Sequence, residues 1–284
     1  MKKFVFKRPS FNKITSLQGF RQIARFYLRK MLYFKQIKNF EKTLNEEDNL
    51  VLKNFFEDKE IACYNVIRRF CDKGLSANKR LELLLFDVKK GLEIIKFYPE
   101  LKIIHTGGGV QLLFGASLIY EEGFWSFYIK AFDKIVYILS FCFTPENELL
   151  IARVQGTLKD SKEALEVNKF LTKQYYGLRP NALLIECAKI LSEILGLKAT
   201  LGVFEKNQVR AGKSKKRGYL VDYQKIWLEN GGTLRTQNGY KCYVLSHKRK
   251  SLEEIASQKR SMYKKRFQIL DEIRSELTKV LNQV

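Results

Sequence analysis

The chain has 284 residues, 45% of them hydrophobic, so it can bury a sizeable core as one large domain or two smaller ones. Its formal net charge of +22 favours polyanionic partners: acidic phospholipid, a phosphorylated ligand or nucleic acid. Five cysteines without a CxxC pair fit a reducing cytoplasm better than a secreted disulfide framework. No window reaches the roughly 18 continuous apolar residues of a membrane-spanning helix, and the basic start has no apolar stretch typical of a signal peptide.

The positive charge lies at the two ends of the chain. Residues 1–100 carry 22 Lys/Arg and 12 Asp/Glu, residues 101–209 carry 12 and 11, and residues 210–284 carry 18 and 7. A near-neutral centre is therefore flanked by two basic regions. We divide the chain into a basic helical N-terminal region (1–100) and an α+β core domain (101–284).

The first 40 residues contain 11 Lys/Arg and no acid. Within them, "ITSLQGFRQIARFYLRKMLYF" predicts an amphipathic helix with Arg21, Arg25 and Arg29 in one column. Two interpretations stay open: the apolar stripe packs on the domain, or the helix lies on an anionic bilayer. The stripe consists of Leu17, Phe20, Ala24, Tyr27, Leu28 and Met31. Further segments with helical periodicity follow, as far as Pro99.

The pattern changes at Leu101, where β-branched and aromatic residues alternate with turn signals. The short connections between the expected strands predict an antiparallel meander. Its strands are expected at 110–119, 124–132, 134–143 and 148–157. The "HTGGGV" run before them is interpreted as a loop into the meander, because no helical pattern opens after its glycines.

Two helices and another strand are expected after the meander. Asp160 is the expected N-cap of the first helix, which ends at Gly177, and Pro180 begins the second, which ends at Gly196. "KATLGVFEKNQV" is the next strand, 210–217 is a basic loop, and a short helix and a hairpin turning at Asn238-Gly239 follow. A Ser251-x-x-Glu254 capping box predicts the start of a long C-terminal helix.

Four blocks in the second half, "LIARVQG", "LTKQYYGLRPNALL", "VDYQKIWLENGG" and "KRSMYKKRFQIL", carry a family resemblance. In order and spacing they resemble the VirK/YbjX family of Gram-negative bacteria, over roughly residues 75–280. The resemblance implies a context of virulence, envelope integrity and resistance to antimicrobial peptides. It implies no particular reaction.

The expected element order also resembles the core of the GNAT acyltransferases. That resemblance implies an α+β fold: a helical N-terminal region, a central antiparallel, GNAT-like mixed sheet with packed helices, and a long C-terminal helix. In GNAT enzymes the fourth strand and the turn after it bind the pantetheine and pyrophosphate of acyl-CoA. The corresponding residues here are Gln155, Gly156, Gly177, Leu178, Arg179 and Asn181. A helical insertion of about twenty residues separates Gly156 from Gly177, which leaves an acyl carrier protein as the alternative donor.

The turn before Pro180 can be interpreted in two ways. The first amides of a helix are free and lie at the positive end of its dipole, so those of Asn181, Ala182 and Leu183 could cradle a phosphate beside Arg179. Alternatively the helix is simply capped, and Arg179 pairs with a nearby acid or lies in solvent.

Candidates for acid–base chemistry are few. His105 borders the sheet, Glu121 lies in a hairpin turn, and Asp222 precedes a short helix. Each also has a structural interpretation: His105 as a sheet-edge residue, Glu121 as a solvated acid and Asp222 as an N-cap. His247 is interpreted as a solvated loop histidine. Residues expected to contact a substrate or partner are Tyr223, Trp227, Lys213, Lys215 and Lys216, with Trp227 equally explained as a buried core residue. No metal motif is present, so no metal is expected.

Three classes of function remain open on these grounds. The first is an acyltransferase-like enzyme at the cytoplasmic face of the inner membrane, using acyl-CoA or an acyl carrier protein. The second is a non-catalytic module that binds anionic lipid or RNA, and the third is a regulatory partner of an envelope-assembly system. Nucleic acid is the less favoured partner, because the basic residues do not belong to a recognisable base-reading fold.

Overall fold

The structure is a computed structural model that describes residues 3–8, 17–57, 59–95, 100–158, 160–210, 221–237 and 240–282. The predicted partner-contact lysines Lys213, Lys215 and Lys216 lie outside the described residues, as do Pro99 and the predicted Asn238-Gly239 turn.

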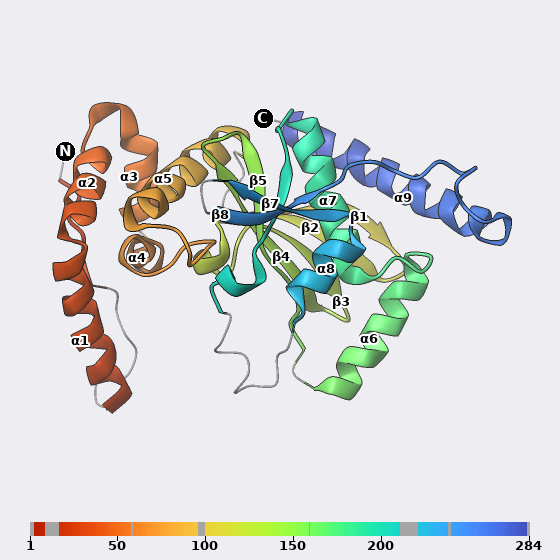
Figure 1. The fold of residues 1–284 in the computed structure, drawn as a ribbon, viewed down its shortest axis with the longest axis horizontal. Coiled ribbons are helices and arrows are strands. Elements are labelled where there is room, and N and C mark those ends of the chain that lie inside the picture. The colour runs from red at the N-terminus through yellow and green to blue at the C-terminus, as the bar shows by residue number, and fades with distance from the viewer. Residues whose placement is uncertain are drawn as a thin grey trace.

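The described part of the chain consists of a helical first third followed by a sheet with flanking helices (Figure 1). The helices are α1 (Leu17–Leu32), α2 (Phe34–Leu44), α3 (Leu50–Glu57), α4 (Glu60–Tyr64), α5 (Ala77–Ile94), α6 (Ser161–Gln174), α7 (Pro180–Ile194), α8 (Tyr223–Glu229) and α9 (Ser257–Asn282). The strands are β1 (Leu101–Gly107), β2 (Val110–Ala116), β3 (Trp125–Ala131), β4 (Lys134–Thr144), β5 (Glu148–Gly156), β6 (Thr200–Val203), β7 (Gly232–Gln237) and β8 (Tyr240–Leu245).

The described strands form one eight-stranded mixed sheet in the order β1-β2-β3-β4-β5-β6-β8-β7. Neighbouring strands are antiparallel except for β5 and β6, which run parallel. The α+β class and the four-strand meander are thus confirmed. The meander gains β1 in front, joined to β2 by Gly108 and Gly109, whose positive φ angles of 57° and 76° suit a tight turn. The glycine run is therefore a hairpin turn.

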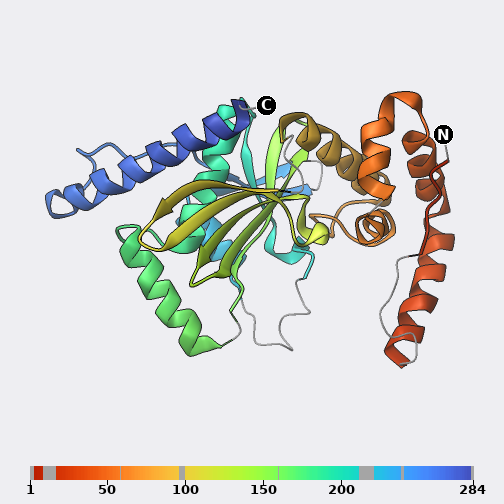
Figure 2. The ribbon, with the colours of Figure 1, turned by 180° about the vertical axis from the view of Figure 1, so that it is seen from behind.

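Helices pack on the sheet from two directions. Helix α7 lies against β3, β4 and β5, and α9 lies along β1 and α7 (Figure 1). The N-terminal helices gather at one side of the sheet, where α5 packs on β4 (Figure 2). One cluster of buried apolar side chains extends from Phe4 to Leu277 and so joins the two regions. The division at residue 100 stays a prediction.

A buried carboxyl group ties α5 to the sheet. Asp87 is fully buried, and its carboxyl oxygens accept hydrogen bonds from the backbone N–H groups of Phe143 (2.7 Å) and Phe124 (3.4 Å). The indole of Trp125 donates to the Asp87 carbonyl oxygen at 3.3 Å. Burial raises the pKa of the Asp87 carboxyl well above its usual range. The helical region is thereby joined to β3 and β4 through specific polar contacts as well as apolar packing.

Most of the predicted helix ends are observed, with one correction. The Asp160 side chain accepts from the N–H groups of Lys162 and Glu163, Gly177 has a φ of 79°, and Pro180 begins α7. The predicted start of α9 at Ser251 is wrong. The N–H of Ser251 does donate to Glu254 at 2.7 Å, but this contact closes only a local turn, and the helix begins at Ser257.

The predicted apolar stripe of α1 faces outward. Phe26 packs inward and is 1% exposed, whereas Phe20 and Met31 are 67% and 77% exposed. Tyr27, Leu28, Leu32 and Phe34 are also exposed. The interpretation in which this stripe packs on the domain is therefore wrong for the described residues of α1. No helix in the described ranges is long and apolar enough to cross a membrane.

Candidate functional site

The parallel strands β5 and β6 separate after a short paired stretch. Residues Leu149–Ile151 pair with Thr200–Gly202, and a register shift in the β4–β5 ladder follows next to Ile151. Strand β5 continues to Gly156, whereas β6 ends at Val203. Beyond this stretch the two strands diverge, and buried side chains of the short helix α8 fill the region between them: Trp227 packs on Gly202 of β6, and Tyr223 lies near Val154 of β5. We call this region between β5, β6 and α8 the wedge.

Trp227 holds α8 in this position. Its side chain is fully buried, and its indole N–H donates to the Val203 carbonyl oxygen at 2.9 Å. The ring lies directly on Gly202, where an added Cβ would come within 2.6 Å of the indole. The packing role of Trp227 accounts for its position in the described structure, and Gly202 is the residue that makes room for it.

Tyr223 lies at the start of α8, its ring 5.7 Å from that of Trp227. Its hydroxyl is buried near the Val154 amide of β5, but it forms no hydrogen bond of normal geometry with any described residue. Burial, reinforced by the negative charge of Glu122, raises the pKa of the Tyr223 phenol. The hydroxyl is therefore a protonated donor without an acceptor.

A buried ion pair lies beside this hydroxyl. The fully buried carboxylate of Glu122 accepts from Arg153 Nη1 at 2.8 Å and from Gln208 Nε2 at 2.9 Å. Arg210 Nε lies 3.7 Å from the same carboxylate. The Nε of Arg153 is buried and lacks a partner among the described residues. Two unpaired donors, Arg153 Nε and the Tyr223 hydroxyl, thus lie at one end of the wedge, and buried donors of this kind are rare in folded proteins.

The three predicted acid–base residues are not brought together. Glu121 forms an ion pair with Arg68, and it is its neighbour Glu122 that enters the buried cluster. Asp222 accepts from the Lys225 N–H at 3.0 Å and is the N-cap of α8. His105 is on β1, four strands away from β5, with Nδ1 3.8 Å from a Glu272 carboxylate oxygen. Desolvation lowers the pKa of the His105 imidazole.

His247 lies in a loop, as predicted, but its imidazole is engaged by two side chains. Its Nδ1 lies 2.9 Å from a Glu193 carboxylate oxygen and its Nε2 lies 3.0 Å from the Thr200 hydroxyl. The imidazole therefore connects α7 to β6, and a structural role accounts for it.

The predicted anion cradle before Pro180 is largely engaged by the protein itself. The Ala182 N–H donates to the Asn181 side chain at 2.9 Å, and the Leu183 N–H donates to the Arg179 carbonyl oxygen at 2.9 Å. The Arg179 side chain is 67% exposed and pairs with Glu229 at 3.3 Å. This is the capped-helix interpretation, so two of the three predicted amide donors are not free.

The remaining donor-turn residues are engaged by the sheet and the core. Gln155 and Gly156 pair with Ile138 and Tyr137 of β4, and Leu178 packs against the core. A shallow groove of about 490 Å³ lies between α6 and the turn at Gly177. Its cationic lining residues are Lys169, Lys173 and Arg179. The described residues contain no cluster of His, Cys, Asp and Glu that could hold a metal ion.

Comparisons with known proteins identify relatives without an assigned reaction. Residues 15–279 match the family described as "Protein of unknown function (DUF535)". An uncharacterized protein of Haemophilus influenzae is 33% identical over 90% of this chain and 89% of its own length. "Membrane protein LapB" of Mannheimia haemolytica is 30% identical over 75% of this chain and 98% of its own, and Escherichia coli YbjX is 28% identical over 37% and 33%. No solved structure matches the chain.

Replacing Glu122 should be far more destabilising than replacing the adjacent Glu121. Glu122→Gln leaves the charge of Arg153 buried without its counter-ion, which costs about 3–5 kcal/mol of unfolding free energy. Glu121→Gln removes an ion pair whose Arg68 side chain is 30% exposed, and should cost about 1 kcal/mol or less. Urea denaturation of the two variants measures the difference. Equal losses would contradict the assignment of Glu122 as the buried partner.

Proposed function

The chain belongs to the DUF535 family, and its resemblance to the VirK/YbjX proteins is confirmed. We propose that it is an acyltransferase-like enzyme of the bacterial envelope. In this proposal it takes an acyl group from acyl-CoA or an acyl carrier protein at the cytoplasmic face of the inner membrane. The observation that carries the proposal is the wedge, where the free edge of β5 and the unpartnered Tyr223 hydroxyl lie together. A role in envelope integrity, antimicrobial-peptide resistance and virulence follows from the family resemblance.

The wedge supports a thioester donor because of what its edges offer. Beyond Ile151, β5 has no β6 partner among the described residues, so its backbone N–H and C=O groups can pair with the amides of a pantetheine arm. The GNAT resemblance expects the donor at the end of β5 and at the turn before α7. Lys169, Lys173 and Arg179 give the neighbouring groove the positive charge that a phosphorylated arm requires.

The proposed chemistry is acyl transfer to an amine or hydroxyl acceptor. The acceptor attacks the thioester carbonyl carbon, the new C–N or C–O bond forms, and the C–S bond breaks. Tyr223 donates its hydroxyl proton to the departing thiolate, a role that its raised phenol pKa allows at neutral pH, and the proton that the acceptor loses restores the phenol. Since the hydroxyl is buried in this state, a donor reaches it only if α8 shifts away from β5.

The outer face of α1 supports a membrane location. Its exposed apolar side chains, which include Phe20, Leu28 and Met31, are accompanied by the exposed cations Arg21 and Arg25. This combination is typical of helices that lie in the interface of an anionic bilayer. A relative whose name is "Membrane protein LapB" adds support. An enzyme held there would meet envelope lipids directly.

Tyr223→Phe should lower acyl transfer by about 100-fold or more, the usual contribution of a general acid, while donor binding stays unchanged. Calorimetry with acyl-CoA and acyl carrier protein measures binding, and release of the donor thiol in the presence of inner-membrane vesicles measures transfer. Tyr175→Phe is the matched control, because the Tyr175 hydroxyl is also buried and unpartnered but does not border the wedge.

The donor experiment also separates this proposal from a non-catalytic one. If neither donor binds the wild type and no thiol is released, the acyltransferase proposal is overturned. Binding to anionic lipid or RNA alone would then favour the binding-module alternative. Equal losses of transfer in Tyr223→Phe and Tyr175→Phe would remove the specific role of Tyr223.

Replacing three exposed residues of α1, as Phe20→Ser, Leu28→Ser and Met31→Ser together, should abolish sedimentation with anionic vesicles without changing the melting temperature. Each cation near such a surface adds about 1 kcal/mol of binding, so raised salt should weaken the wild type as well. The control combines Phe132→Ser, Leu165→Ser and Leu234→Ser, which are equally exposed elsewhere. Wild-type binding that is equal on neutral vesicles, or absent from both, would contradict the membrane role.

A further inference from the structure

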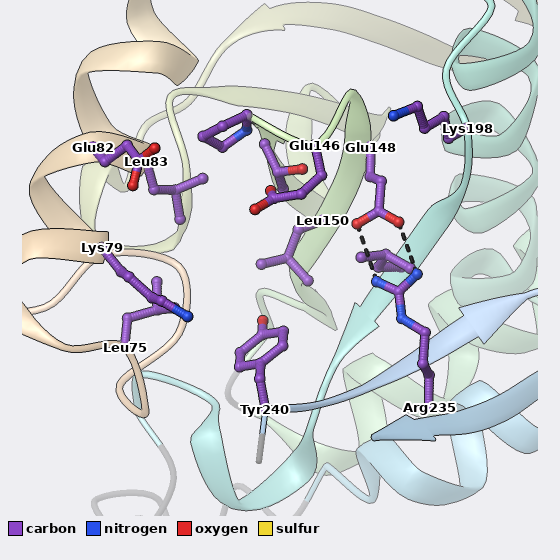
Figure 3. A pocket seen from close by; sticks show the side chains of 13 residues that line it. Leu75, Lys79, Glu82, Leu83, Glu146, Glu148, Leu150, Lys198, Arg235 and Tyr240 are labelled. Atoms are coloured by element: carbon purple, nitrogen blue, oxygen red, sulfur yellow. Dashed lines mark hydrogen bonds and ion pairs between the residues drawn. The ribbon is translucent and has the colours of Figure 1, made fainter. Parts of the chain in front are cut away.

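A cavity lies apart from the wedge, between the first turns of α5 and the sheet (Figure 3). Its volume is about 400 Å³, within the range of small-molecule sites. Four leucines give it an apolar lining: Leu75, Leu83, Leu150 and Leu201. The first two belong to the N-terminal region and the other two to β5 and β6, so the cavity exists only where the regions meet.

One polar atom of the lining has no partner. Thr144 at the end of β4 is 7% exposed, and its hydroxyl is buried without a hydrogen bond to any described residue. A buried hydroxyl left unpaired destabilises the folded protein, and a bound ligand with a polar group would satisfy it. This atom is independent of the apolar lining and points to a ligand rather than to a packing gap.

The cavity's charges are balanced in a chain whose net charge is +22. Glu148 and Arg235 neutralise one another through two hydrogen bonds of 2.8 and 3.0 Å. The remaining charged lining residues are two cations, Lys79 and Lys198, and two anions, Glu82 and Glu146. Within the described part of the chain, these four side chains make no ion pair or hydrogen bond with one another or with other residues. Figure 3 shows the Lys79 ammonium and the Tyr240 hydroxyl directed towards the cavity.

This distribution selects among ligand charges. A purely anionic ligand would be attracted by Lys79 and Lys198 but repelled by the two carboxylates. A purely cationic ligand would be attracted by the carboxylates but repelled by the lysines. Figure 3 shows Lys79 and Lys198 at opposite sides of the cavity, so a molecule with one group of each sign can pair with Lys79 and with a carboxylate of Glu82 or Glu146. The leucines meanwhile require an aliphatic part, since polar atoms placed against them would lose their hydration.

We propose that this cavity binds a small zwitterion with an aliphatic part. The ammonium group lies towards Glu82 and Glu146, the acidic group lies towards Lys79, and the aliphatic part lies on the leucines. A polar atom of the ligand bonds with the Thr144 hydroxyl. This site does not depend on the acyltransferase proposal, because none of its residues borders the wedge's Tyr223 end.

The test is calorimetric titration of the full chain with defined probes. Two zwitterions represent the two sources of this chemistry: hexanoyl lysophosphatidylethanolamine for a lipid headgroup and norleucine for a free amino acid. Hexanoyl lysophosphatidic acid and hexylamine are the singly signed controls with the same chain length. We expect at least one zwitterion to bind, and to bind ten-fold or more tightly than either control.

Variants locate the binding. Thr144→Val, which keeps the side-chain shape, and the exposed double change Lys79→Gln with Lys198→Gln should each weaken the binding zwitterion five-fold or more. Lys89→Gln with Lys259→Gln, two exposed lysines on α5 and α9, should not. Absence of binding by both zwitterions, equal binding by the phosphate or amine control, or binding unchanged by both test variants would overturn the proposal. Circular dichroism confirms that each variant is folded.

Discussion

The buried ion pair between Glu122 and Arg153 is the interaction on which the arrangement of the wedge depends. It joins three segments that are distant in sequence: the turn before β3, the strand β5, and the segment after β6 that supplies Gln208. Two charges held away from water cost desolvation free energy, which their attraction and the hydrogen bond from Gln208 must offset. Such a pair contributes little net stability when intact, but it fixes which segments meet.

The same pair determines the surroundings of Tyr223. The negative charge of Glu122 adds to burial in keeping the phenol protonated, and Arg153 brings an unpaired N–H into the same space. Trp227 on Gly202 holds α8 over the open side. The wedge is thus closed by packing that one short helix supplies, and a donor enters only when the contacts of Tyr223 and Trp227 are broken. The proposed donor site and its closure therefore arise from the same few contacts.

Much of the fold could be predicted from the sequence because its signals are local. Alternating strands with short connections required an antiparallel meander, and Asp160, Gly177 and Pro180 marked helix ends through their own backbone preferences. The start of α9 was missed because the Ser251–Glu254 contact that signals a capping box can also close an isolated turn. The hydrogen bond from Ser251 to Glu254 is the same in a capping box and in an isolated turn, so the local sequence could not show which of the two structures forms.

The candidate site was predicted less well because its signals are not local. Glu121 and Glu122 are adjacent and chemically identical, and only the position of Arg153, 31 residues from Glu122, decides which is buried. The amides after Pro180 looked free, but Asn181 and Arg179 already accept from two of them. Tyr223 and Trp227 were both expected to contact a substrate or partner, but Trp227 packs on Gly202 of β6, and the Tyr223 hydroxyl lies near Val154 of β5.

Hydrogen exchange with and without an acyl donor tests the central claim, that the donor lies between β5 and α8. We expect acyl-CoA or acyl carrier protein to slow amide exchange in residues 152–156, because the free edge of β5 acquires partners, and to change exchange in 221–229. The paired stretch 149–151 should not respond, since its amides are already bonded within the sheet. Slowed exchange confined to other parts of the chain, or no change with either donor, would contradict the claim.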